Sequence, residues 1–332
     1  YANPVMVDAL ILGREGTTEP ETPPVYYAPA LPAVEYLGTL DRWDPWVRAY
    51  VGLGELMIGI DFGSTNTSSL VKSGTSTIAE IGRPVAATFQ TQLPLVLSWA
   101  ELRNERATEI LAQIDPQYAF WSSIVYMHPD RTRRTFELIN ILLQFCVYVE
   151  MRMKHALGCW RPVEYNAQVQ PMITTPGHGS YPSGHSTQAH AVAHMLKALL
   201  NLNATDAGGN YKYDTVRDQL NRQAARIATN RVVAGVHFPV DSMAGRMLGV
   251  ALGEYFIGRC VNQQSMKSRT FISTEFDKPQ YASLDFNPFS NNQNLDTGPF
   301  HGLGSTAWNI PYSPLLNAFW NAAQGEWRGK FP

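Results

Sequence analysis

The sequence predicts a globular and largely helical protein. Its 332 residues are 45% apolar and only 16% charged, a balance typical of a chain with a substantial buried core and not of a disordered one. Several long segments carry apolar residues at helical spacing, whereas the alternating polar and apolar runs that indicate long strands are missing. These observations predict an all-α fold, a helical bundle with an irregular N-terminal arm and an extended C-terminal tail.

Composition and periodicity divide the chain into three segments. Residues 1–80 are rich in Pro, Gly and Thr and are expected to form an irregular arm with one or two short helices, packed on the body. Residues 81–260 are expected to form the helical catalytic body. Residues 261–332 become polar and rich in Asn, Pro and Phe, and are expected to form an extended segment of the same domain.

Five segments of the body have the periodicity of helices. Ser183 is expected to open one of them, Asp214 to cap another, and Pro239 to occupy the first helical position of a third. The most apolar run, Leu138–Val149, is too short to span a membrane and is expected to be a buried core helix. The predicted helical segments are residues 88–114, 131–157, 183–202, 214–235 and 239–260.

One stretch of the arm, GIDFGSTNTSS at residues 59–69, resembles the phosphate-binding turn of the actin and sugar-kinase ATPases. That family needs strands on both sides of the turn and a second, similar turn much later in the chain. The sequence indicates neither, so a polar surface loop is the favoured interpretation.

The charge and the cysteines exclude several classes of function. A formal net charge of -2 provides no polybasic surface, which argues against a nucleic-acid-binding protein. Cys146, Cys159 and Cys260 form no CxxC pair and are interpreted as buried thiols. No run reaches the roughly 18–20 apolar residues of a membrane span. The first residues lack the features of a signal peptide, so a secreted or periplasmic location would require a signal already removed.

Three segments place cationic or hydrogen-bonding groups where an oxyanion would need them. In the first, KHALGCWRP, Lys154 and Arg161 are seven residues apart. This is close to two helical turns, so both side chains are expected on one face of a helix that Pro162 ends. Taken alone, such a pair is more often part of a solvated face.

The second segment, YPSGHS, is expected to lead a loop into the N-terminus of a helix. Unpaired N–H groups and the helix dipole favour anions there. Gly184 would let an oxyanion approach the backbone closely, Ser183 adds a hydroxyl donor, and His185 exchanges protons near neutral pH.

The third segment, NRVVAGVHFPVD, places Asp241 four residues after His237 and Arg231 six residues before it. An Asp at that distance can accept a hydrogen bond from one imidazole nitrogen and leave the other as a nucleophile or metal ligand. As an isolated feature, a structural His–Asp pair is an equally good interpretation.

In chain order the segments read K-x6-RP, PSGH and R-x5-H-x3-D. This order resembles the signature shared by the vanadium-dependent haloperoxidases and the type 2 phosphatidic acid phosphatase superfamily, which includes bacterial acid phosphatases. The resemblance covers roughly residues 131–252. One position departs from it, because Asn230 stands where a Ser often precedes the third-motif Arg. The resemblance implies two halves like four-helix bundles and a homo-oligomer, a dimer or larger.

The resemblance also implies an oxyanion cradle for a vanadate cofactor. Lys154, Arg161 and Arg231 would neutralise the equatorial oxygens, and Ser183 and the Gly184 N–H would complete the cradle. Phosphate has the same charge and shape, so it is expected to compete for the site.

The histidines would perform the chemistry. His237 would bond to vanadium and Asp241 would orient it, while His185 would act as general acid–base on the opposite side. His178 occurs at the offset of a second histidine in bromide- and iodide-oxidising relatives, which implies a role in halide preference. Met151 departs from the family, since relatives often carry an aromatic residue near the halide there.

Two activities fit these residues, and a third class of function stays open. A haloperoxidase of the bromide type would use hydrogen peroxide to oxidise a halide, and the product would halogenate small organic acceptors. A soluble acid phosphatase would instead form a phosphohistidine at His237. The third class is a binding module that has lost turnover. The larger body, the residues around the second and third motifs, and His178 favour the haloperoxidase.

Two other histidines, His190 and His194, are four residues apart on one predicted helix. This spacing can hold zinc, but no Glu lies between them and no third ligand is evident. They are expected to be packed helix positions.

Overall fold

The computed structural model describes residues 3–17, 30–34, 36–115 and 117–331. The chain consists of two compact units, Tyr1–Arg42 and Trp43–Pro332. The first unit contains helix α1 (Pro4–Thr17) and the 3₁₀ helix η1 (Leu37–Arg42). All the predicted site residues lie in the second unit. The boundaries expected near residues 80 and 260 stay a prediction.

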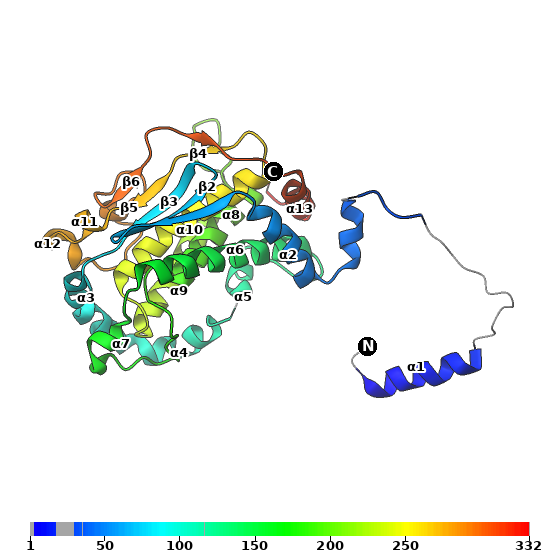
Figure 1. The fold of residues 1–332 in the computed structure, drawn as a ribbon, viewed down its shortest axis with the longest axis horizontal. Helices are drawn as coiled ribbons and strands as arrows, with labels where there is room; N and C mark the ends of the chain where they lie inside the picture. Colours follow the sequence, from blue (N-terminus) through cyan, green and yellow to red (C-terminus); the bar gives the residue numbers. More distant parts are fainter. Residues whose placement is uncertain (1–2, 18–29, 35, 116, 332) are drawn as a thin grey trace. The chain divides into compact units, whose positions relative to one another are not determined.

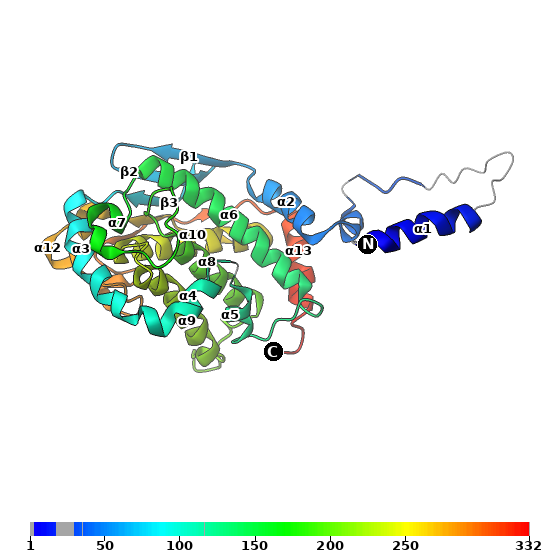
Figure 2. The ribbon, with the colours of Figure 1, turned by 90° about the horizontal axis from the view of Figure 1, so that it is seen from below.

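The prediction of a helical fold is confirmed, because the described part of the chain is largely helical. Helix α8 lies at the centre of the second unit, where it packs against α10, α9 and α6 (Figures 1 and 2). The helices of this unit are α2 (Pro45–Leu56), α3 (Ala86–Trp99), η2 (Ala100–Leu102), α4 (Arg103–Ala112), α5 (Tyr118–Ser122), α6 (Arg133–Leu157), α7 (Pro162–Tyr165), η3 (Ala167–Val169), α8 (Gly184–Leu199), α9 (Asp214–Val233), α10 (Pro239–Cys260), α11 (Ser273–Phe276), α12 (Pro279–Ala282), η4 (Asn291–Gln293) and α13 (Pro314–Gly325).

Local sequence signals position the central helices. Ser183 is the N-cap of α8, and its hydroxyl oxygen accepts a hydrogen bond from the backbone N–H of Ser186. Pro239 is the first residue of α10, as predicted. Asp214 is the first residue of α9 and not its cap, because Tyr213 occupies the cap position. The predicted core helix lies within α6, and all three cysteines are free and buried.

A five-stranded sheet lies beside the helices and was not predicted (Figure 1). Its order is β1-β2-β3-β5-β6, with only the β3–β5 pair parallel. Strands β3 and β5 contact α10, and β2 contacts α6. A separate pair, β4–β7, is antiparallel. The strands are β1 (Ile60–Ser64), β2 (Ser68–Ser73), β3 (Ser76–Gly82), β4 (Ser265–Met266), β5 (Arg269–Phe271), β6 (His301–Leu303) and β7 (Trp308–Asn309).

The prediction of a surface loop at residues 59–69 is therefore wrong, because most of these residues belong to the β1–β2 hairpin. The buried positions of β2 are Ser69, Val71 and Ser73. Two of these three residues are polar, so the alternation of apolar and polar residues that indicates a strand is weak in the sequence.

The helix that carries Lys154 ends earlier than predicted. Gly158 has a left-handed backbone conformation (φ 55°) and caps α6 after Leu157. Pro162 does not end this helix but starts α7, with Arg161 as the N-cap. Lys154 and Arg161 therefore do not share a helix face, and the turn at Gly158 brings Arg161 to the site from a separate segment.

Because two histidines are buried, we expect the free energy of unfolding to fall at low pH. His190 and His301 are 6% and 7% exposed, and burial lowers the pKa of each from 6.5 to about 3. Between these values the unfolded chain binds more protons, so stability is present above 6.5 and is lost as the pH falls. We expect the free energy of unfolding to fall by up to about 1.4 kcal/mol per pH unit for each residue, measured by urea denaturation.

His190→Gln should remove one of these contributions and flatten the dependence of stability on pH. The matched control is His155→Gln, which replaces an exposed histidine of α6 and should leave the slope unchanged. An identical slope in the wild type and His190→Gln would contradict the prediction.

Candidate active site

One cavity of ≈ 330 Å³ contains most of the residues of the three motifs. It lies where the end of α6, the start of α8, the end of α9 and the segment before α10 meet. Apolar side chains, among them Ile114, Val147, Met151 and Ile173, form part of its wall. The predicted site residues on the wall are Lys154, Arg161, His178, Gly184, His185, Arg231 and His237, whereas Ser183 and Asp241 are fully buried beside it.

Lys154 is almost fully buried near the end of α6. Its Nζ donates hydrogen bonds to the backbone carbonyls of Gly179 (3.1 Å) and Ser180 (2.8 Å). An ammonium group has three donors, so one N–H remains for a ligand. Burial lowers the pKa of Lys154 to about 7, and Arg161 acts in the same direction. An anion in the cavity would favour the charged form.

Glu150, one turn before Lys154, belongs to the site although the sequence analysis missed it. Its Oε1 accepts a hydrogen bond from Gln188 (2.9 Å), while its Oε2 has no partner among the described residues. Burial raises its pKa to about 7. A Cβ at Gly184 would lie 2.7 Å from Oε1, so a larger residue there would require the Glu150 carboxyl group to move. The spacing of four residues before Lys154 is the signal that could have revealed it.

Arg161 connects the first motif to both histidine-bearing segments. Its Nη1 donates to the Val236 carbonyl (2.7 Å) and lies 3.1 Å from Nε2 of His237. Its Nη2 lies 3.1 Å from Nδ1 of His178, and its Nε donates to the His178 carbonyl (3.2 Å). The exposed His178 is therefore held against the cationic part of the cavity.

Arg231 is the least satisfied cation of the site. Its Nη2 donates to the carbonyl of Ile110 (3.0 Å) and to Oε1 of Gln113 (3.1 Å). Its Nε and Nη1 are buried without a partner among the described residues. Burial lowers the pKa to about 10, so the guanidinium stays charged at neutral pH. Unpaired buried donors are costly, and an oxyanion would satisfy them.

Hydrogen bonds connect Asn230 and Gln113 to Arg231. Asn230 donates to Oε1 of Gln113 (2.9 Å), the same atom that accepts from Arg231. The residue that departs from the family pattern therefore contacts the partner of the arginine and not the cavity itself. Sequence reasoning also missed Gln113, because it lies outside the three motifs and meets them only in the folded chain.

His237 and Asp241 form the pair expected from their spacing. Nδ1 of His237 lies 2.9 Å from Oδ2 of Asp241, which also accepts from the Phe238 N–H (2.9 Å). Asp241 lies in the first turn of α10, and this second bond fixes the carboxyl group. Burial lowers the pKa of His237 well below its usual range. The proton of the neutral ring lies on Nδ1, so the lone pair of Nε2 faces Arg161.

His185 is also neutral. Its Nε2 lies 2.9 Å from the carbonyl oxygen of Gln113. A carbonyl only accepts, so Nε2 carries the proton and Nδ1 keeps a free lone pair. Burial, together with the charge of Arg231, lowers the pKa of His185 to about 3. The ring therefore stays unprotonated at Nδ1 in mildly acidic solution.

Ser183 ties the start of α8 to α10. Its N–H donates to the backbone carbonyl of Asp241 (2.9 Å), and its hydroxyl oxygen accepts from the N–H of Ser186 (3.4 Å). The hydroxyl can still donate its own proton. The second and third motifs are thereby held together by backbone and cap contacts.

Among the residues that the structure describes, no group of three or more His, Cys, Asp or Glu side chains is arranged to hold a metal ion. His190 and His194 do not reach the motif cavity. They line a different cavity further along α8.

The comparison with known families matches this part of the chain. The sequence profile of the PAP2 superfamily fits residues 136–264, and all nine predicted site residues lie inside this range. The chain contains a PAP2 superfamily domain. This PAP2 domain includes most of α6 and the whole of α7 to α10, the elements that build the motif cavity.

Part of the chain is also similar to a named protein. A stretch of 121 residues is 34% identical to the vanadium-dependent bromoperoxidase of Ascophyllum nodosum. The stretch covers 31% of this chain and 20% of that protein, so the match spans only about a fifth of the relative's length. No helix in the described residues is long and apolar enough to cross a bilayer.

Proposed function

We propose that this protein is a vanadate-dependent haloperoxidase that uses hydrogen peroxide to oxidise bromide or iodide, and that the hypohalous product halogenates small organic acceptors. The observation that carries the choice is His178, whose Nδ1 lies 3.1 Å from Arg161 at the edge of the cationic cavity. The similarity to a vanadium-dependent bromoperoxidase supports the same choice. A homo-oligomer is part of the proposal.

The donor set of the cavity fits a vanadate ion. Two nitrogens of Arg231 and one N–H of Lys154 are available, and the N–H groups that start α8 point to the same region. When bound, vanadate would supply a Lewis acid that activates peroxide without a change in its oxidation state. The residues proposed to hold it are Lys154, Arg161, Ser183, Gly184 and Arg231, with Nε2 of His237 as the protein ligand.

The protein's own residues would handle the protons. Nδ1 of His185 has a free lone pair and would take a proton from hydrogen peroxide; the charge of a bound oxyanion would counteract the burial that lowers the pKa of this ring. Nζ of Lys154 would donate to a peroxide oxygen and weaken the O–O bond. Overall, one hydrogen peroxide, one halide ion and one proton give one hypohalous acid and one water.

The cavity wall suits a halide better than a phosphate ester. Ile114, Val147, Met151 and Ile173 lie beside the cations and make one side of the cavity apolar. A large, weakly hydrated halide loses little solvation there, and Met151 is polarizable.

An acid phosphatase is the second candidate, supported by the geometry of His237. With its Nδ1 held by Asp241, Nε2 could attack phosphorus and form a phosphohistidine. His185 would have to protonate the leaving group, and its lowered pKa bears on both candidate activities, because each passes a proton through this ring. The preference for the haloperoxidase therefore depends on His178 and on the similarity to the bromoperoxidase.

The deciding experiment compares two activities of one preparation. The protein is incubated with orthovanadate, peroxide and bromide are added at mildly acidic pH, and bromination of a phenolic dye is followed. Hydrolysis of p-nitrophenyl phosphate is measured without vanadate. We expect bromination that depends on vanadate and is inhibited by phosphate. Phosphate release without bromination would overturn the haloperoxidase proposal.

His178→Ala should change halide preference more than vanadate binding. His178 contacts Arg161 but is exposed, so its loss should alter the halide's surroundings while the buried donors stay in place. We expect the ratio of kcat/KM for bromide to that for iodide to change about tenfold, with the vanadate Kd within about threefold of the wild type. His155→Ala serves as the control, and an unchanged ratio would remove the proposed role of His178.

A further inference from the structure

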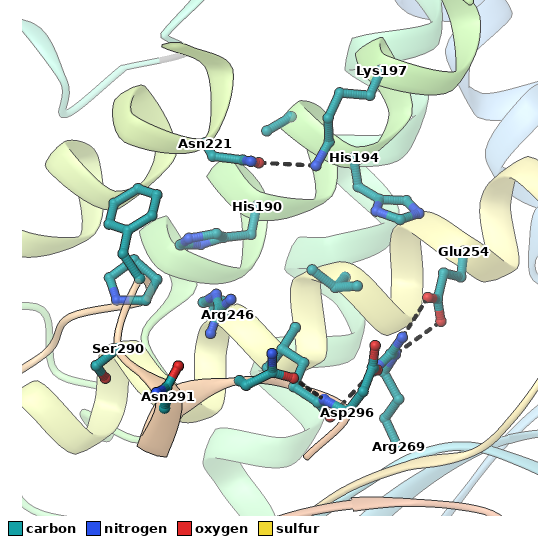
Figure 3. Close-up of a pocket in the computed structure, with 16 residues that line it drawn as sticks. His190, His194, Lys197, Asn221, Arg246, Glu254, Arg269, Ser290, Asn291 and Asp296 are labelled. Carbon is teal, nitrogen blue, oxygen red and sulfur yellow. Dashed lines mark hydrogen bonds and ion pairs between the residues drawn. The ribbon is translucent and has the colours of Figure 1, made fainter. Parts of the chain in front are cut away.

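A second cavity of ≈ 450 Å³ shares no lining residue with the motif cavity. Its walls come from the second half of α8, from α9 and α10, and from residues 288–296 (Figure 3). The motif cavity lies at the start of α8, so the two cavities use different parts of the same central helix. Its volume is in the range of small-molecule sites.

Two cations of this cavity lack a carboxylate partner among the described residues. Nζ of Lys197 donates to Oδ1 of Asn221 (2.9 Å), and Nη1 of Arg246 donates to the backbone carbonyl of Gln293. Both partners are neutral. In the view of Figure 3, Arg246 lies between His190 and the segment that carries Ser290 and Asn291.

The third cation is different, because its charge is already neutralised. Arg269 forms ion pairs with Glu254 (2.7 Å) and Asp296 (2.8 Å) (Figure 3). Asp296 also acts on Arg246, but it is exposed and bonded to Arg269. The cavity thus has three cations and two carboxylates, and its excess of one positive charge lies with Lys197 and Arg246, which have no ion pair of their own.

Burial makes this excess charge costly. It lowers the pKa of Lys197 to about 8, with Arg217 and Arg246 acting in the same direction. It also lowers the pKa of Arg246 to about 10. A bound anion would stabilise both charged forms, and hydrogen bonds between charged partners are about twice as strong as neutral ones.

His190 adds an unused acceptor to the same cavity. Its Nδ1 lies 2.8 Å from the Ser186 carbonyl and therefore carries the proton. Its Nε2 is buried without a partner among the described residues. An unprotonated nitrogen in this position accepts a hydrogen bond, which a hydroxyl group of a ligand can donate. The rim adds neutral polar side chains, namely Ser290, Asn291 and Asn294.

We infer that the second cavity binds a small polyhydroxylated molecule that carries a phosphate or sulfate group, with the anionic group between Arg246 and Lys197. The hydroxyl groups of the ligand bond to Nε2 of His190 and to the polar rim. A free oxyanion shares the same cationic contacts. This inference does not depend on the proposed haloperoxidase activity.

The test measures the binding of glucose 6-sulfate and of inorganic sulfate by calorimetry at low ionic strength, where screening is weak. Sulfate esters are chosen so that a phosphatase activity cannot consume the probe. We expect glucose 6-sulfate to bind more tightly than inorganic sulfate. Equal affinities would show that Lys197 and Arg246 bind an oxyanion alone and that the cavity does not recognise the hydroxyl groups of the ligand.

Matched variants locate the site. Arg246→Gln and Lys197→Gln should each weaken binding of glucose 6-sulfate at least about tenfold. Arg222→Gln removes an exposed cation beside Phe289 at the rim, and Arg161→Gln removes a cation of the motif cavity. Both should retain binding. Thermal melts check the fold, and Lys197→Gln decides the question if Arg246→Gln does not fold.

Unchanged binding in Arg246→Gln and Lys197→Gln would overturn the inference. Loss of binding in Arg161→Gln alone would assign the probe to the motif cavity and would overturn it as well.

Discussion

His237→Ala should abolish turnover, whichever of the two proposed activities the protein has. The tautomer of this imidazole is fixed, since Asp241 holds Nδ1, and the remaining nitrogen, Nε2, faces the cations. Alanine removes that nitrogen and leaves the cation cluster. We expect kcat/KM to fall by at least about 10³-fold, a loss typical of residues that act directly on the reacting atoms.

The measurement pairs activity with binding. Bromination and phosphate release are followed in parallel, and vanadate binding is measured by ⁵¹V NMR. His155→Ala changes the same residue type at an exposed position of α6 and should keep full activity. A His237→Ala protein that is folded and retains a tenth of the wild-type activity would show that His237 does not take part in the chemistry.

Arg231→Met should remove oxyanion binding with little change in stability. Its Nε and Nη1 are buried without a partner among the described residues, so they can bind an oxyanion, whereas Nη2 bonds to Ile110 and Gln113. A hydrogen bond to a charged group is worth about 1.5–3 kcal/mol, so the loss of two predicts that the affinity for vanadate or phosphate falls by at least about 100-fold. Methionine has a similar length and carries no charge to bury, which offsets the loss of the Nη2 bonds to Ile110 and Gln113, so the free energy of unfolding should change little.

The control for this prediction lies on the same helix. Arg226 is exposed and pairs with Glu109 (2.6 Å), outside the motif cavity. Arg226→Met should leave vanadate affinity unchanged. Urea denaturation gives the stability of both variants. A marked destabilisation of Arg231→Met, with vanadate affinity preserved, would assign Arg231 a structural role in place of the proposed one.

Local signals made much of the helical framework predictable. A cap such as Ser183, a proline at a first helical position such as Pro239, and long apolar periodicity all act within a few residues, so the sequence displays them directly. The His237–Asp241 contact was predictable for the same reason, because four residues of chain separate its partners. The other residues of the candidate site were predicted from the order of the three motifs, which resembles a known family signature.

Contacts between distant segments were not predictable in this way. The sheet depends on pairing β3 with β5, nearly two hundred residues later, and strands this short leave little periodic signal. Arg161 was expected on the helix of Lys154, but the left-handed turn at Gly158 places it on a separate segment. Gln113 reaches Arg231 from outside the motifs.

The sequence by itself determined which chemical groups are present, in which order, and which helices carry them. The tertiary structure decided which of these groups are buried without partners. Arg231 faces the motif cavity with two free nitrogens, while Arg269, equally cationic, is neutralised by Glu254 and Asp296. The physical reason is that burial and pairing depend on side chains brought together from distant parts of the chain, and local periodicity does not encode them.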